Sequence, residues 1–227
     1  MFQIIERRAD FEPNDNCSTH VHISPDDGGW TFDHLKQLSK AIIYFDHAFA
    51  ALVPPTRRRS GWAVRNRYQS GRATLSVDEW FNLIEGCWNQ EELTDLMSPI
   101  RTHAWNFQNL NRSKGTVEFR QPPPVTTQYQ CIGWVELTVG FVDSSRIIDA
   151  EGLFDFSPDV EGLWEFVTYA RELQYFELDC LNRIFKDKSG SIGWTSVTAV
   201  DPELEEKKSQ EARKPYTLPD KFDKAQN

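Results

Sequence analysis

A short run at residues 115–120, Gly-Thr-Val-Glu-Phe-Arg, constrains the fold more than any other part of the sequence. Its β-branched and aromatic residues favour a strand, in which successive side chains alternate between two faces. Val117 and Phe119 then share one face. Glu118 and Arg120 share the other. We therefore expect a sheet with one apolar face and one face that carries ionisable groups.

Glu118 lies between two apolar residues, where an unpaired carboxylate would be costly. Such a group needs a cation, and Arg120 and a divalent metal are the two candidates. If Glu118 only formed an ion pair with Arg120, the pair would have a structural role and no chemical one. The sequence leaves both interpretations open.

A second run, Ser18-Thr19-His20-Val21-His22-Ile23-Ser24, alternates in the same way. Val21 and Ile23 form its apolar side. His20 and His22 lie two residues apart and so project from one face, where both could approach a single ligand or metal. The alternative is a pair of partly exposed histidines without a chemical role.

The remaining sequence predicts mostly helices. Thr31 is a plausible N-cap for a long helix to Leu52, and Pro54 and Pro55 end it. In a long helix towards Ile148, we expect an inward stripe of apolar residues, namely Ile132, Val135, Val139 and Val142. Further helices are expected at 76–85, 89–97, 160–174 and 176–185, and strands at 2–5 and 103–110. The expected fold class is α+β, an antiparallel sheet packed by helices.

Composition and charge exclude several classes of protein. The chain has 227 residues, a formal charge of -9 and a sequence pI near 5.1, which argues against nucleic-acid binding over the whole surface. Its four scattered cysteines have no C-x-x-C spacing, so we interpret them as reduced thiols. No stretch approaches the roughly 20 apolar residues of a membrane span, and the N-terminus lacks a signal-peptide core. We expect a cytoplasmic protein.

One segment reverses this acidic balance. Residues 57–72 contain no acid and include the arginines Arg57, Arg58, Arg59, Arg65, Arg67 and Arg72. An arginine cluster of this kind is suited to binding an anion, most naturally phosphate. A solvated loop whose charge compensates acids elsewhere is the equal alternative.

Taken together, these segments resemble a fungal family of amidoligases, which is similar to glutamine synthetase and glutamate-cysteine ligase. The resemblance rests on Cys17 to Ile23, the long helix and arginine cluster, Asn109-Leu110, the 115–120 run and Trp134. It covers roughly residues 17–148 of an amidoligase-like domain at 1–200 that ends in helices at 159–186. Residues 201–227 are expected to form a disordered charged tail.

The resemblance implies an ATP- and Mg²⁺-dependent carboxylate–amine ligase that activates the acid as an acyl phosphate. By position, His20, His22 and Glu118 match metal ligands, and Glu118 and Arg120 match catalytic positions. Arg57 to Arg59 match positions that would contact nucleotide. The partners would be small-molecule or peptide carboxylates and amines, and the sequence does not indicate an oligomeric state.

The sequence also departs from the family pattern. A Gly-x-Glu-x-Glu-like strand is expected before the histidine strand, and residues 1–16 do not contain it. We expect either that N-terminal strands are missing or that the chain is a non-catalytic binding or regulatory relative. A metal-dependent hydrolase that uses His20 and His22 is a third interpretation.

Overall fold

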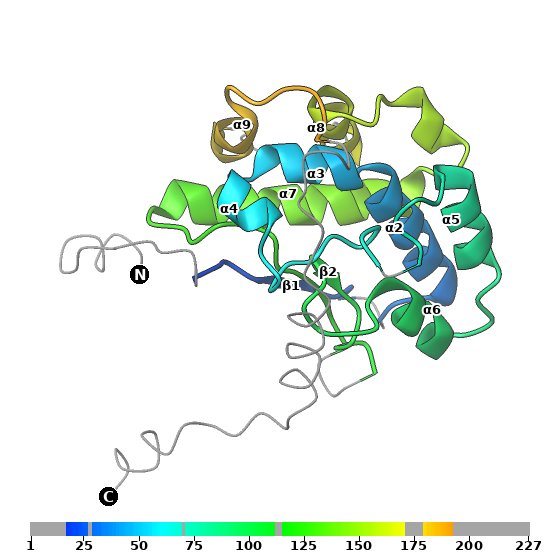
Figure 1. Cartoon of the computed structure of the whole chain (residues 1–227). Coiled ribbons are helices and arrows are strands. Elements are labelled where there is room, and N and C mark those ends of the chain that lie inside the picture. The colour runs from blue at the N-terminus through cyan, green and yellow to red at the C-terminus, as the bar shows by residue number, and fades with distance from the viewer. Residues whose placement is uncertain (1–16, 27–28, 70, 112–114, 171–178, 193–227) are drawn as a thin grey trace, which may run out of the picture.

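In the computed structural model, helices cover one face of a small antiparallel sheet (Figure 1). The structure describes residues 17–26, 29–69, 71–111, 115–170 and 179–192. The strands are β1 (Val21–Ile23), β2 (Trp105–Asn106) and β3 (Val117–Phe119), in the order β1-β3-β2. This mixed architecture agrees with the expected antiparallel sheet packed by helices.

The predicted helices occur in the expected order along the chain, together with two short helices that were not predicted, at 55–58 and 152–155. Their bounds are α2 (Phe32–Tyr44), α3 (Asp46–Leu52), α4 (Pro55–Arg58), α5 (Val77–Glu85), α6 (Gln90–Met97), α7 (Gln128–Ile147), the 3-10 helix η1 (Gly152–Asp155), α8 (Val160–Tyr169) and α9 (Asp179–Phe185). Several starts are set by side-chain caps. Thr31 accepts a hydrogen bond at the start of α2, and Ser76 forms a capping box with Glu79 at the start of α5.

One face of the sheet carries large aromatic side chains. Trp105 and Phe119 lie opposite each other on neighbouring strands, and their rings stack at a centroid distance of 4.4 Å. Phe49 of α3 packs on Phe119, and Phe141 of α7 packs on Trp105. All four side chains are almost fully buried, so this face forms the centre of the core.

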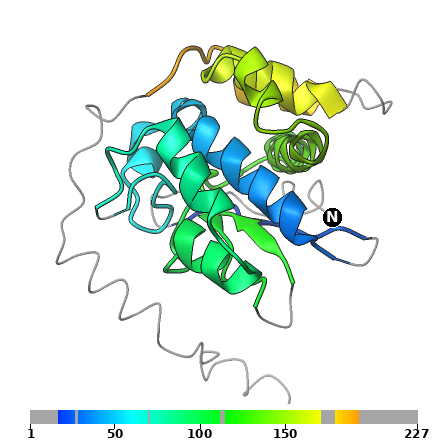
Figure 2. The same cartoon turned by 90° about the vertical axis from the view of Figure 1, so that its right-hand side faces the viewer.

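The helices lie in two layers over this face. In Figure 1, α2, α3 and α7 lie next to the sheet, and α8 and α9 lie beyond them. Figure 2, turned by 90°, shows the same order, with α5 and α6 beside α2. Among the described elements, the opposite face of the sheet lacks such a helical layer (Figures 1 and 2).

The predicted inward stripe of α7 is wrong for three of its four residues, and only Val142 is buried as expected. Ile132, Val135 and Val139 are 36–40% exposed, whereas Trp134, Leu137 and Phe141 are buried with Val142. This helix is apolar on more than one side and packs against α2, α8, α9 and β1, so periodicity alone could not identify its inner face. Gly133 helps to set that orientation, because a Cβ there would lie 2.5 Å from the carbonyl oxygen of Cys180.

Two other elements differ from expectation. The first helix is divided at Phe45 into α2 and α3, and the predicted strand at 103–110 is reduced to the two residues of β2. The predicted strand at 2–5, residues 171–174 and 176–178 of the two predicted helices, and the predicted tail at 201–227 lie outside the described residues. None of the described helices is long and apolar enough to cross a membrane.

Candidate active site on the polar face of the sheet

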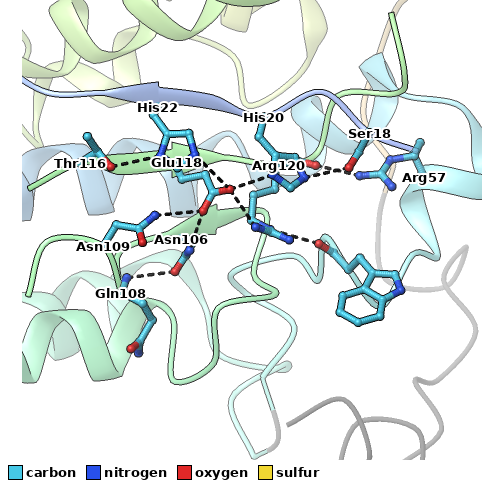
Figure 3. A network of polar contacts seen from close by, with 11 residues as sticks. Ser18, His20, His22, Arg57, Asn106, Gln108, Asn109, Thr116, Glu118 and Arg120 are labelled. Atoms are coloured by element: carbon cyan, nitrogen blue, oxygen red, sulfur yellow. Dashed lines mark hydrogen bonds and ion pairs between the residues drawn. The ribbon is translucent and has the colours of Figure 1, made fainter. Parts of the chain in front are cut away.

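The polar face of the sheet gathers side chains around Glu118. The strand register places His22 of β1 and Asn106 of β2 directly opposite Glu118 of β3. His20 precedes β1 and Arg120 follows β3, and both side chains turn toward the same carboxylate (Figure 3). We call His20, His22, Asn106, Asn109, Glu118 and Arg120 the Glu118 cluster.

Both oxygens of the Glu118 carboxylate have partners. Oε1 lies 2.9 Å from Nδ1 of His20, 2.8 Å from Nη1 of Arg120 and 3.5 Å from Nε2 of His22. Oε2 accepts hydrogen bonds from the side-chain amides of Asn106 at 2.8 Å and Asn109 at 3.1 Å. The carboxylate therefore organises side chains from five positions around one buried negative charge.

These partners determine the ionisation of Glu118. Burial would raise its pKa, but the hydrogen bond from His20, the charge of Arg120, the hydrogen bond from Asn106 and the charge of His22 together lower the pKa to about 2. Burial also lowers the pKa of the Arg120 guanidinium, and the charge of Glu118 opposes that change. The Glu118 carboxyl is therefore ionised at neutral pH.

The histidines connect this buried charge to the surface. The Glu118 side chain is 5% exposed, whereas the side chains of His20 and His22 are 32% and 35% exposed. Nδ1 of His22 also lies 3.2 Å from the Thr116 hydroxyl, and Nε2 of His20 lies 2.8 Å from the Ser18 hydroxyl. A ligand at the surface can reach these imidazoles while Glu118 stays buried.

The sequence predicted part of this cluster. His20, His22, Glu118 and Arg120 are brought together as the alternation indicated. Sequence reasoning missed Asn106, although it alternates with Trp105 and Phe107 and should therefore share the face of Glu118. Ser18, Thr116 and Asn109 were not recognised as partners because their contacts depend on strand pairing and loop geometry.

The arginines of residues 57–72 are largely engaged within the fold. Arg57 is 2% exposed and donates to the carbonyl oxygens of Arg120 at 2.8 Å and Gln121 at 3.3 Å. Arg58 donates to the carbonyl oxygen of Ala50, and Arg59 is exposed. Nucleotide contact by Arg57 to Arg59 stays a prediction, for which Arg59 is the residue with an exposed side chain.

The donor set of the Glu118 cluster does not fit Mg²⁺. Glu118 is its one carboxylate, its two oxygens already accept from side chains, and the Arg120 guanidinium lies on the same oxygen as His20. Mg²⁺ prefers a nearly octahedral set of oxygen ligands, and a cation at that oxygen opposes a metal. Within the described ranges, no group of three or more His, Cys, Asp or Glu residues could hold a metal ion.

The fold and the cluster together define a mixed α/β domain with a charged, histidine-containing site on the open face of a sheet. A family model described as "putative amidoligase enzyme" matches residues 1–142. The chain belongs to this amidoligase family. A search of curated proteins and a search of solved structures found no match.

Proposed function

We propose that the protein is a carboxylate–amine ligase whose acid substrate binds at the Glu118 cluster. Family membership supports amide-bond formation, and the observation that carries the placement is the buried carboxylate that fixes His20 and Arg120. We further propose a glutamine-synthetase-like arrangement, in which the antiparallel sheet presents the site and helices cover its other face. ATP is the co-substrate that the resemblance implies, and no step is assigned to Mg²⁺.

Three residues of the cluster have roles that follow from their contacts. Arg120 supplies a positive charge for the substrate carboxylate, and its other contact, from Nε to the carbonyl oxygen of Trp62 at 3.4 Å, restrains its position. His20 supplies a second polar group at the surface. Glu118 holds both and offsets the charge of Arg120, so the site need not reorganise when an anion binds.

The test measures ATP consumption and amide formation by the full chain. The reaction contains ATP, MgCl₂ and pooled carboxylates and amines, and products are identified by mass spectrometry. Arg120→Gln should lower turnover by about 100-fold, as removal of a positioned electrostatic donor does in other enzymes. Arg146→Gln, at an exposed arginine near the end of α7, is the matched control and should keep full turnover.

A second function is favoured because both oxygens of the Glu118 carboxylate already contact side chains of the chain itself. With five side-chain partners and no metal set in the described part of the chain, the cluster suits a non-catalytic binding relative of the ligases. Binding of a carboxylate without ATP consumption in calorimetry would support this function over the ligase. ATP-dependent amide formation that Arg120→Gln abolishes would exclude it.

A further inference from the structure

A serine, a histidine and a carboxylate form a continuous chain of contacts at the surface end of the Glu118 cluster. The Ser18 hydroxyl lies 2.8 Å from Nε2 of His20, and Nδ1 of the same ring lies 2.9 Å from Oε1 of Glu118 (Figure 3). Both nitrogen atoms of one imidazole are therefore used, one toward a hydroxyl and one toward a buried carboxylate. This is the geometry by which a nucleophile, a base and an orienting acid are recognised.

We propose that Ser18 is a nucleophile that accepts an acyl group, with His20 as its general base and Glu118 as the residue that positions His20. Glu118 accepts from Nδ1–H of His20, which leaves the lone pair of Nε2 directed to the Ser18 hydroxyl. The activity would be acyl transfer from an activated carboxylic acid derivative, such as an ester, to an amine or water. Neither the amidoligase family match nor the proposed ligase function assigns a role to Ser18.

The backbone around Ser18 is held in place by the segment that follows β3. The Thr19 hydroxyl donates to the carbonyl oxygen of Pro123 at 3.0 Å, and the Thr19 amide donates to that of Pro122 at 3.4 Å. Proline fixes the backbone of this segment, so its carbonyl groups form a stable anchor. Ser18 and His20, on either side of Thr19, are therefore positioned relative to Glu118 at the end of the sheet.

Access and charge also suit this activity. Ser18 is half-buried and the His20 side chain is 32% exposed, so an acyl donor can approach from solvent. Arg120 binds the same oxygen of Glu118 as His20 does, which places a guanidinium beside the imidazole. That positive charge would stabilise negative charge that develops on the attacked carbonyl oxygen.

The reaction balances with the groups that are present and an activated acyl donor. As Oγ of Ser18 bonds to the carbonyl carbon, its proton passes to Nε2 of His20. The bond from the carbonyl carbon to the leaving group then breaks, and the leaving group takes that electron pair and the proton from Nε2. An amine or water next attacks the acyl-serine ester with His20 as base, which releases the product and regenerates the hydroxyl.

The experiment uses a fluorophosphonate probe on the full chain, because this reagent forms a stable P–O bond to an activated serine and releases fluoride. Intact mass and peptide mapping should show one adduct, at Ser18, which Ser18→Ala removes. His20→Gln should slow labelling by about 100-fold, the usual contribution of a general base. Ser24→Ala, at an exposed serine just beyond β1, should leave labelling unchanged.

A further variant distinguishes loss of the general base from a general disturbance of the Glu118 cluster. His22 shares the carboxylate of Glu118, and its other nitrogen lies near Thr116 and not Ser18, so His22→Gln should slow labelling less than about tenfold. No adduct, an adduct on the neighbouring Cys17, or equal labelling rates in wild type and His20→Gln would each overturn the proposal. The assay contains no ATP, so its failure would leave the ligase proposal standing.

Discussion

Two carboxylate–arginine pairs in this molecule show how the same chemical groups serve different ends. Asp46 and Arg65 are 5% and 2% exposed, and two guanidinium nitrogens of Arg65 contact one oxygen of Asp46. Glu118 and Arg120 are also paired, but their cluster includes two histidines that are about one-third exposed. Burial of every partner gives a structural element, whereas a buried acid with surface partners gives a site that a ligand can reach.

The Asp46–Arg65 pair should be the more costly of the two to disrupt. Asp46→Ala leaves a buried guanidinium without its carboxylate, and we expect a loss of about 3–5 kcal/mol in the free energy of unfolding. Urea unfolding followed by tryptophan fluorescence measures this loss. A loss below that of the corresponding Glu118 variant would contradict the comparison.

Glu118→Ala should cost less, about 2–3 kcal/mol, although it removes an acceptor from five side chains. The histidines are partly exposed, so water can replace their contacts with Glu118. Arg65 is buried, so water cannot replace its contact with Asp46 in the same way. Glu118→Gln is the matched control, since it keeps one acceptor oxygen and should recover part of the loss. Equal losses for Asp46→Ala and Glu118→Ala in urea unfolding would show that exposure of the partners has no effect.

Protonation provides a third way to compare fully buried groups with the Glu118 cluster. His103 is buried beside the backbone of Val64 and Arg65, and burial lowers its pKa to about 4. The folded state therefore resists a proton that the unfolded chain takes up near its ordinary pKa of 6.5. Stability falls as the pH drops below 6.5, and the fall from this group ends near pH 4.

By this linkage, His103 should account for a loss of about 2 kcal/mol between pH 7 and pH 5. His103→Gln carries no titratable group, so its stability should change less over the same range. Urea unfolding of both proteins at several pH values measures the difference. Parallel pH profiles for wild type and variant would show that His103 is not the cause. The carboxyl of Glu118, with its pKa lowered from 4.5 to about 2, contributes stability that is lost as the pH falls from about 4.5 toward 2.

The alternation of side chains predicted the polar face of the sheet because it is a local property of a strand. It placed His22 with Glu118 and put Phe119 in the core before any pairing was known. The α7 stripe failed because that helix has apolar residues on several sides, and the choice among them depends on which elements pack against it. Local pattern therefore predicted where charge would gather, and tertiary packing decided which helix face was buried.

The difference between local pattern and tertiary contact also explains why the contacts of the arginines and the role of Ser18 were not predicted. A run of arginines without acids indicates an anion-binding surface, but Arg57 and Arg58 find backbone carbonyl groups that only the folded chain brings near. Arg65 finds Asp46, nineteen positions away. The contact of Ser18 with His20 spans two residues, yet its significance depends on Glu118, almost 100 positions further along the chain.

Arg57 and Arg59 allow a test of whether an arginine of this segment stabilises the fold or lies free for an anion. The expected change in the free energy of unfolding is the smallest of those predicted. Arg57→Gln removes donors from the carbonyl oxygens of Arg120 and Gln121 just after β3, and should lower the free energy of unfolding by about 1–2 kcal/mol. Arg59→Gln, two positions on at an exposed side chain, should change it by less than about 0.5 kcal/mol. Equal changes in urea unfolding would mean that the buried contacts of Arg57 do not stabilise the fold. A larger change for Arg57 would place it with Arg65 among the structural arginines and leave Arg59 as the better candidate for phosphate contact.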